Sequence, residues 1–309
     1  MRKHYILLLL LSFVIIGKAQ QDPQYNLYQF NQMVINPAYA GARDVLAVVA
    51  SVRNQWTGFD GAPRTSCLSI HGPIMNKHLG LGLTVVSDKM GPRSMAGVYG
   101  NIAYIAQLSS KYKLSFGLNA GYNRFQFDFN KLNLKDNESS SAYFSQTQTY
   151  NKLDANGGLY LRSNTFFVGL SVTHLFNPSL FSVKDSSGTS ILSYSLKTHQ
   201  FFTMGKSFKL SDNCIFAPTI MFRQVNGKGN GDLNLNFFIY KKVWLGMFYR
   251  GGYGSGFLMQ YYVTNKFRVA YSFDTGARDA RKLGASHEVM LGFDFSGNTK
   301  SKVISPRFL

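Results

Sequence analysis

Apolar and polar residues alternate with a period of two along most of the chain. The clearest stretch runs from Tyr112 to Asn123, where aromatic and aliphatic residues fall on one face of an extended strand and polar residues or glycine fall on the other. The same alternation recurs at residues 166–173, 232–239 and 288–295. A strand with hydrocarbon on one side and a polar interior on the other has this pattern.

About fourteen such strands can be counted, an even number within the range of single-chain outer-membrane barrels. They begin near Val45, Arg64, Leu79, Met95, Tyr112, Leu153, Thr165, Thr198, Asn213, Gly231, Val243, Gly256, Phe267 and His287. We therefore predict an all-β fold, a transmembrane outer-membrane β-barrel of antiparallel strands over residues 43–297.

The connections between the predicted strands alternate between short and long. The short ones are residues 75–78, 109–112, 162–164, 210–212, 240–242 and 264–266, and the long ones include residues 55–63, 87–94, 130–152, 177–195 and 274–286. Barrels of this class have short periplasmic turns and longer external loops. The alternation therefore predicts that both termini face the periplasm.

The first residues predict export. Arg2, Lys3 and His4 precede the apolar run from Tyr5 to Ile16, and Gly17-Lys18-Ala19 places small residues at a signal-peptidase site. This is the pattern of a cleaved secretory signal. We predict a signal peptide over residues 1–19, an N-terminal periplasmic or plug segment over 20–42, a periplasmic C-terminal tail over 298–309, and location in the cell outer membrane.

The chain is basic, with a net charge of +18, and removal of the three positive charges of the signal leaves 18 − 3 = +15. A basic protein raises nucleic acid as a partner, but export argues against it and favours outer-membrane lipid and lipopolysaccharide. Basic residues gather at the predicted periplasmic turns, notably Lys241 and Lys242, whereas the predicted external loops mix signs, with Asp88 and Asp154 among their acids. The basic rim has two interpretations: anchoring at lipid headgroups, or docking of an acidic periplasmic partner.

No residue pattern indicates catalysis or a cofactor. Cys67 and Cys214 lack metal-site or disulfide spacing. His71, His174, His199 and His287 occur without a nucleophile elbow or an HExxH element. The glycine clusters at residues 227–231 and 251–256 lack a dinucleotide-binding context and predict external hairpins with positive φ. The sequence predicts no enzyme activity, no metal and no cofactor.

Two stretches are candidate binding elements. In the first external hairpin, Arg53, Trp56, Phe59 and Arg64 surround glycines and a proline. They are either interface aromatics with turn residues or a patch that grips a secreted polypeptide, because Trp and Arg are favoured binding anchors.

The second stretch is "VINPAYAGARD", at residues 34–44. Asn36-Pro37 predicts an extended turn, Gly41 and its small neighbours allow close approach to the barrel wall, and Tyr39 is expected to be an interface anchor. The stretch predicts a hinge that tucks the N-terminal segment into the barrel mouth, or merely the start of the barrel.

Several motifs together resemble one family. "QDPQYNLYQFNQMVINPAYAG", "VRNQWTGFDGAPRTSCLSI", "LGLGLTVVSDKMGP" and "GASHEVMLGFDF" resemble the PorP/SprF outer-membrane proteins of Bacteroidota, and the resemblance spans essentially the whole mature chain. It implies a role in the type IX secretion system and, in gliding species, in motility. The implied partners are a secreted surface adhesin or other client and the periplasmic ring or lipoprotein components of the machine.

Two functions remain open at this point. One is docking and anchoring of secreted proteins. The alternative is a passive or ligand-gated porin for small solutes. Occupancy of the lumen distinguishes them, because a porin needs an open path, whereas the N-terminal segment, the long loops or bulky inward residues such as Phe167, Phe238 and Trp244 would plug an anchor.

Overall fold

A computed structural model describes residues 22–131, 146–184, 190–276 and 278–295 of the protein. The predicted signal peptide (1–19) and C-terminal tail (298–309) lie outside the described residues, as does most of the long connection at residues 130–152.

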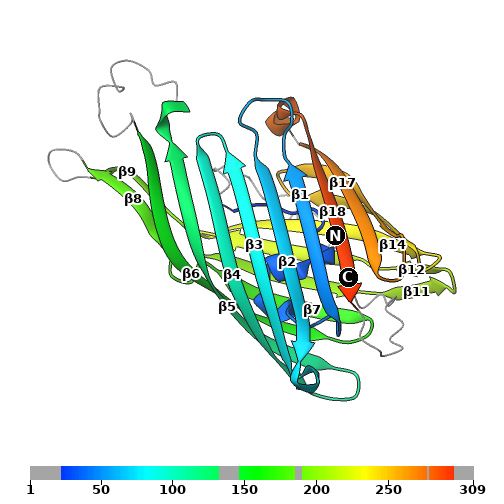
Figure 1. Ribbon diagram of the computed structural model, residues 1–309. Coiled ribbons are helices and arrows are strands. Elements are labelled where there is room, and N and C mark those ends of the chain that lie inside the picture. Colours follow the sequence, from blue (N-terminus) through cyan, green and yellow to red (C-terminus); the bar gives the residue numbers. More distant parts are fainter. Residues whose placement is uncertain (1–21, 132–145, 185–189, 277, 296–309) are drawn as a thin grey trace, which may run out of the picture.

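The fold is a closed antiparallel barrel of fourteen strands (Figure 1). Twelve of the fourteen strands are continuous. They are β1 (Leu46–Asn54), β2 (Arg64–Ile74), β3 (Leu79–Met90), β4 (Arg93–Gln107), β5 (Lys113–Asp128), β6 (Thr147–Arg162), β7 (Phe166–Thr173), β14 (Lys228–Ile239), β15 (Val243–Arg250), β16 (Gly254–Tyr262), β17 (Phe267–Gly276) and β18 (Ala285–Phe295). The pairing of β1 with β18 closes the ring. The predicted fold class is confirmed.

Each of the two remaining strands of the barrel is interrupted once, so that it carries two labels. One consists of β10 (His199–Lys206) and β11 (Phe208–Ser211), and the other of β12 (Cys214–Phe216) and β13 (Thr219–Val225). The second break falls at Ala217-Pro218. Proline has no backbone N–H to give to a ladder, which accounts for an interruption there.

Side chains alternate across the wall as the sequence pattern predicted. In β4 and β5, inward residues such as Ser115 and Asn123 are buried, while outward residues include Ile102 and Leu118, which are 50% and 61% exposed. Such exposure of large apolar side chains is unfavourable in water and favourable in lipid. The outer belt therefore faces hydrocarbon, and the inward face is left to be satisfied from within the lumen.

The six predicted short turns are confirmed, and they gather at one end of the barrel, which we call the turn end. The other end, called the loop end, carries most of the longer connections (Figure 1). One predicted long connection, residues 87–94, is wrong. Strands β3 and β4 continue to Met90 and Arg93 and are joined only by Gly91 and Pro92, with Gly91 at φ +55°. Polar residues there belong to strand rather than to loop.

The glycine-cluster hairpins behave as predicted. Gly227 turns β13 into β14 at φ +72°, and Gly252 turns β15 into β16 at φ +75°.

Connection 177–195 contains a separate hairpin of β8 (Ser179–Lys184) and β9 (Ser190–Ser195), which pairs only with itself. The helices of the described residues are short 3₁₀ turns, and none has the length and apolar content that would let a helix cross a membrane. Three of them, η1 (Tyr28–Phe30), η2 (Gln32–Val34) and η3 (Pro37–Tyr39), precede the first strand.

Candidate functional site

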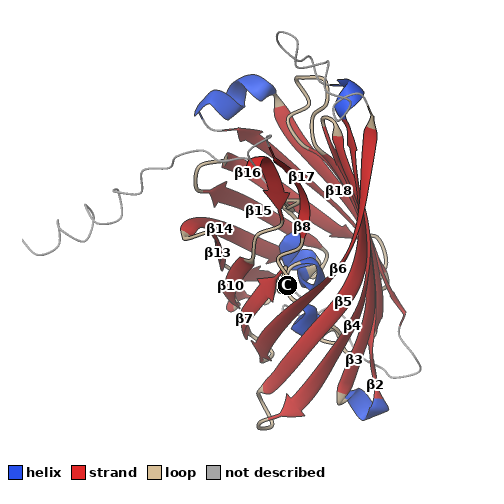
Figure 2. Ribbon diagram, turned by 90° about the vertical axis from the view of Figure 1, so that its left-hand side faces the viewer, coloured by secondary structure: helices blue, strands red, loops and turns tan. Residues whose placement is uncertain are grey.

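Residues 22–45, which we call the luminal segment, fill the interior of the barrel. Figure 2 shows its short helical turns inside the ring of strands. Tyr28, Phe30, Ala38 and Tyr39 are each no more than 2% exposed. Phe30 packs on Trp244, which stacks on Phe238 at a centroid distance of 4.5 Å. Trp244 and Phe238, two of the bulky inward residues named from sequence, therefore pack in the lumen with the luminal segment.

Asn36 ties the luminal segment to the wall. Its Oδ1 accepts a hydrogen bond from the Ala38 N–H at 3.0 Å, which caps η3, and Pro37 occupies the first helical position, where no N–H is needed. The Asn36 Nδ2 donates to the carbonyls of Leu159 on β6 and Leu170 on β7, at 3.0 and 3.3 Å. One side chain thus both forms the turn and fastens it to two strands.

Inward glycines leave the space that this turn occupies. A Cβ added at Gly80 would lie 2.1 Å from the Ala40 carbonyl oxygen, at Gly117 2.2 Å from the Ala38 nitrogen, and at Gly158 2.1 Å from the Asn36 Oδ1. These glycines belong to β3, β5 and β6. Any side chain at these points would enter the backbone or cap of the luminal segment.

Tyr39 and Gly41 make further contacts between the luminal segment and the barrel wall. The Tyr39 ring makes edge contacts with His71 and Tyr160, each at a centroid distance of 5.4 Å. Gly41 adopts φ +75°, and its N–H donates to the His71 Nδ1 at 3.1 Å. The expectation that Tyr39 anchors at the membrane interface is wrong: the side chain lies in the lumen because it has partners there.

An ion pair at one end and hydrogen bonds to buried carboxylates near the other hold the luminal segment. Near β1, Asp294 of β18 accepts from Arg43 and from Arg268, both at 2.7 Å. Toward the loop end, the Asn26 N–H donates to Glu288 and its Nδ2 donates to Asp274, both at 2.6 Å. Buried charges are tolerated only when paired, so the segment and the inward charges of the strands depend on each other.

The predicted patch in the first hairpin is not assembled. Arg53 faces the lumen, 3% exposed, and pairs with Asp274 at 2.9 Å and Glu288 at 3.7 Å. Arg64, opposite Asn54 in the ladder, lies on the outer face and is exposed. Because side chains alternate along a strand, Arg53 and Arg64 point to opposite sides of the wall.

The other members of that patch differ in exposure. Trp56 is half-buried and adopts φ +54°. Its backbone N–H donates to the Ser286 Oγ at 3.3 Å. Phe59 is 42% exposed. At the turn end, Lys241 and Lys242 are exposed in the turn between β14 and β15.

A cluster of histidines and acids surrounds the start of the luminal segment. The Asp22 carboxylate lies 2.8 Å from the Nε2 of His174 and 2.9 Å from the Nδ1 of His199, and His174 also contacts Asp154. Burial opposes the charged form of His174, but the charges of Asp22 and Asp154 and their hydrogen bonds outweigh it and raise the pKa of His174 to about 10. Burial likewise opposes the Asp22 charge, and His174 and His199 hold its pKa well below the ordinary value.

A cavity of about 110 Å³ remains beside the luminal segment, lined by Tyr25, Met33, Tyr99, His174 and Arg223 among others. It has room for a few water molecules. Among the described residues, no group of three or more His, Cys, Asp or Glu side chains is placed to hold a metal ion.

Sequence reasoning missed the ion pairs, because their partners are up to 251 residues apart in the chain. A signal was present: Arg268, Glu288 and Asp294 occupy inward positions of the period-two pattern, where charges require partners.

The chain is similar to one known family in sequence and to solved barrels in fold. A family model described as type IX secretion system membrane protein PorP/SprF matches residues 17–293. No curated protein matches the chain. Among solved structures, the toluene transporter TodX of Pseudomonas putida aligns over 85% of this chain and 94% of its own, at 9% identity and a TM-score of 0.50.

Two further solved barrels align at lower scores. The CymD monoaromatic hydrocarbon channel aligns over 92% and 96% of the two chains, at 11% identity and a TM-score of 0.48. Omp33 of Acinetobacter baumannii aligns over 81% and 98%, at 11% identity and 0.46. At such identities the likeness concerns the fold alone.

Proposed function

Because the chain belongs to the PorP/SprF family of type IX secretion system membrane proteins, we propose that it docks secreted cell-surface proteins at the outer membrane and couples them to the periplasmic machinery. The proposed clients are adhesins or other type IX substrates, and the proposed periplasmic partners are ring or lipoprotein components. The protein would act by binding, without catalysis.

The filled lumen is the observation that carries this proposal. A passive porin needs a continuous water-filled path, yet the luminal segment and the Phe30, Trp244 and Phe238 cluster occupy the interior. A barrel whose inside is committed to its own chain has its ends and outer surface left for partners. This supports anchoring over the porin alternative.

Surfaces at both ends are available for such contacts. Phe59 and Arg64 at the loop end are exposed candidates for a client, with Trp56 beside them, and Lys241 and Lys242 at the turn end are candidates for a periplasmic partner. In this proposal Asn36, Pro37, Tyr39 and Gly41 form the hinge and plug element that keeps the barrel closed.

Affinity purification from native outer membranes tests the proposal. We expect the tagged wild-type barrel to recover a secreted surface protein together with subunits of the secretion machine, identified by mass spectrometry. An unrelated tagged outer-membrane barrel from the same cells is the control. Recovery of neither class of partner would overturn the docking function.

Single-channel recording separates the porin alternative. We expect the wild-type barrel to show no large steady conductance, and deletion of residues 22–34 to create one, because the wall stays paired while Tyr28, Phe30 and Met33 are removed from the lumen. A large steady conductance in the wild type would favour the porin.

A further inference from the structure

Among the described residues, one edge of β6 has no strand partner in the part of the barrel wall nearest the loop end. Strand β6 pairs with β5 from Thr147 to Arg162, but its ladder with β7 covers only Gly157 to Arg162. Beyond that, the Leu175 N–H donates to the Ala155 carbonyl at 3.0 Å. Within the described residues, no backbone hydrogen bond joins Thr147, Thr149, Asn151 or Leu153 to the β7 side of β6.

The orientation of the unpaired backbone groups follows from this last hydrogen bond. The Ala155 carbonyl points toward the β7 side, and both backbone groups of a strand residue point to the same side, alternating along the strand. Thr147, Thr149, Asn151 and Leu153 therefore present their N–H and C=O groups at the unpaired edge. We call these four residues the β6 edge.

Most of the β6 edge lies beyond the hydrocarbon belt. Outward residues are apolar up to Tyr122 on β5 and Leu153 on β6, and polar above them, with Arg124, Thr149 and Asn151 exposed. An open edge is not tolerated in lipid. It is tolerated in water, where it is a ready template for another strand.

The β8–β9 hairpin does not close this seam. It pairs only with itself, and its Phe181 and Tyr194 pack on Phe127, at centroid distances of 5.2 and 5.6 Å. Phe181 also contacts Tyr150, whose inward position on β6 places the hairpin on the luminal side of the strand. The described part of the hairpin thus packs against the luminal face of β5 and β6 and makes no ladder with the β6 edge.

An apolar groove of about 850 Å³ begins at the foot of the edge, on the hydrocarbon-facing surface of the barrel wall. Leu175, which donates the last hydrogen bond to β6, lines it together with Leu118, Gly157, Leu170 and Val172. Gly157 contributes no side chain, so the groove is hollow between leucines. In strand addition, backbone hydrogen bonds supply affinity and side-chain pockets supply selectivity. An unpaired edge that runs into an apolar groove combines both.

We propose that the β6 edge takes up an extended segment of the secreted surface protein as an additional strand, with apolar residues at its membrane-proximal end entering the groove. This inference rests on the proposed client-docking function and specifies where and how the client binds. The recognised chemistry is a β-strand with polar residues opposite Thr147–Asn151 followed by apolar ones.

A proline at the edge tests backbone pairing directly. Asn151→Pro removes the N–H that faces the vacant side and leaves the ladder with β5 intact, because proline is tolerated on strand edges. Asn151→Ala changes the side chain but keeps the N–H and is the matched control. The probe is the surface protein that the wild-type barrel recovers, identified and then expressed separately.

We expect Asn151→Pro to weaken binding of that protein about tenfold or more, on the scale of a lost backbone pairing, and Asn151→Ala to leave it within about twofold of wild type. Gly157→Leu, which fills the groove, should also weaken binding. Heat-modified migration on gels establishes that each variant is a folded barrel, and Thr149→Pro serves as the second edge variant.

Equal binding by both proline variants and by Asn151→Ala would overturn the edge proposal while leaving the docking function standing. Loss only with Gly157→Leu would also overturn it, since contact would then be through the groove alone. Failure of the wild type to recover any surface protein would instead overturn the docking function itself.

Discussion

At the scale of single residues, glycines on the inward face decide whether the lumen can be filled. The period-two pattern correctly predicted that Gly117 and its neighbours face inward, and the "NPAYAG" stretch was predicted to approach the barrel wall closely. The pattern could not show that the "NPAYAG" stretch packs against Gly117, because the contact joins residues about 80 apart in the chain and depends on the missing Cβ at Gly117.

Gly117→Val should expel the luminal segment. Its Cβ would lie 2.2 Å from the Ala38 nitrogen and 2.5 Å from the Pro37 carbonyl carbon, both backbone atoms that cannot step aside. Overpacking of this kind costs about 1–3 kcal/mol. We expect faster trypsin cleavage after Arg43, which is 2% exposed in the wild type.

Gly100→Val is the matched control, because a Cβ there meets nothing within 4 Å. Equal protection of Arg43 from trypsin in Gly117→Val and in wild type would show that the glycine is not needed for the dock.

At the scale of elements, strands were predictable and the luminal segment was only partly so. The alternation of apolar and polar residues located the strands, because one side of each strand faces lipid. The 3₁₀ turns η1 to η3 carry no such period, since they are surrounded on all sides by the barrel, and only the Asn36-Pro37 pair marked one of them. The error at residues 87–94 has the opposite origin: polar residues there continue a strand beyond the membrane.

The outer end of the luminal segment should be pH-dependent. The pKa of His174 is raised to about 10 from an ordinary value of 6.5. A raised pKa contributes stability that is fully present below about 6.5 and is lost as pH rises through about 10. The lowered pKa of Asp22 contributes stability above its ordinary value of 3.8 that is lost only as pH falls below it. The segment should therefore be held most firmly between these limits, near pH 4–6.5.

Thermal unfolding of the barrel in detergent, followed from pH 6 to pH 10, checks this. We expect the midpoint to fall with pH by a few degrees more in wild type than in His174→Gln. His287→Gln, at a histidine that contacts Tyr271 instead of an acid, should keep the wild-type slope. Parallel curves for wild type and His174→Gln would contradict the assignment.

At the scale of the whole molecule, the distribution of charge is sharper than the sequence predicted. Asp88 and Asp154 were expected in external loops of mixed sign, but both are buried in the wall facing the lumen, and Asp154 contacts His174. Asp88 had been assigned to the connection at residues 87–94, and Asp154 lies just after the connection at residues 130–152. Both acids pair inside the lumen, Asp88 with Arg93 and Asp154 with His174, so neither offsets the exposed basic residues at the barrel ends.

Charge reversal at the turn end tests whether this basic surface binds a periplasmic partner. Lys241→Glu with Lys242→Glu changes the local charge by four units in an exposed turn, without touching the lumen. Because electrostatic attraction governs such encounters and is screened by salt, we expect loss of the co-purified machine subunits, and a similar loss for the wild type when salt is raised to about 0.5 M. Retention of the subunits by the reversed barrel would leave lipid-headgroup anchoring as the role of the rim.

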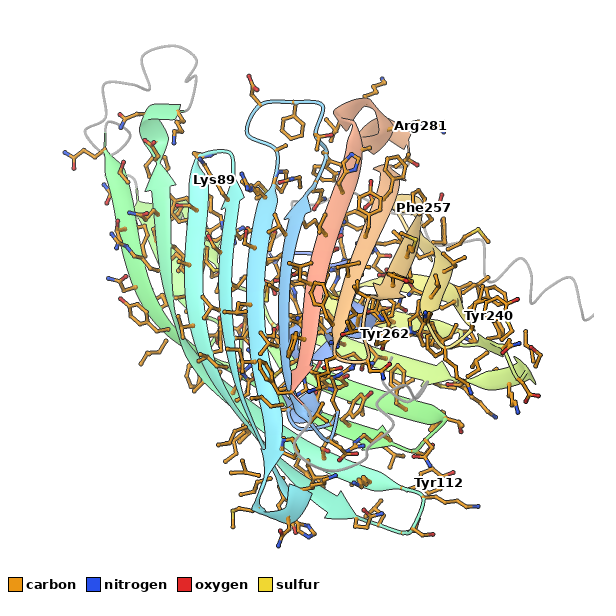
Figure 3. The ribbon with its side chains drawn as sticks, turned by 45° about the vertical axis from the view of Figure 1, so that its right-hand side comes forward. Lys89, Tyr112, Tyr240, Phe257, Tyr262 and Arg281 are labelled. Carbon is orange, nitrogen blue, oxygen red and sulfur yellow. The ribbon has the colours of Figure 1, made fainter. Side chains whose placement is uncertain are left out.

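The matched control is Lys89→Glu with Arg281→Glu, an equal change of charge at exposed residues of the loop end (Figure 3). It should leave the machine subunits bound, because those residues face the exterior. If both double variants lost the subunits equally, net charge of the barrel, and not a docking face at the turn end, would govern the association. Only loss confined to Lys241→Glu with Lys242→Glu assigns the periplasmic contact to that rim.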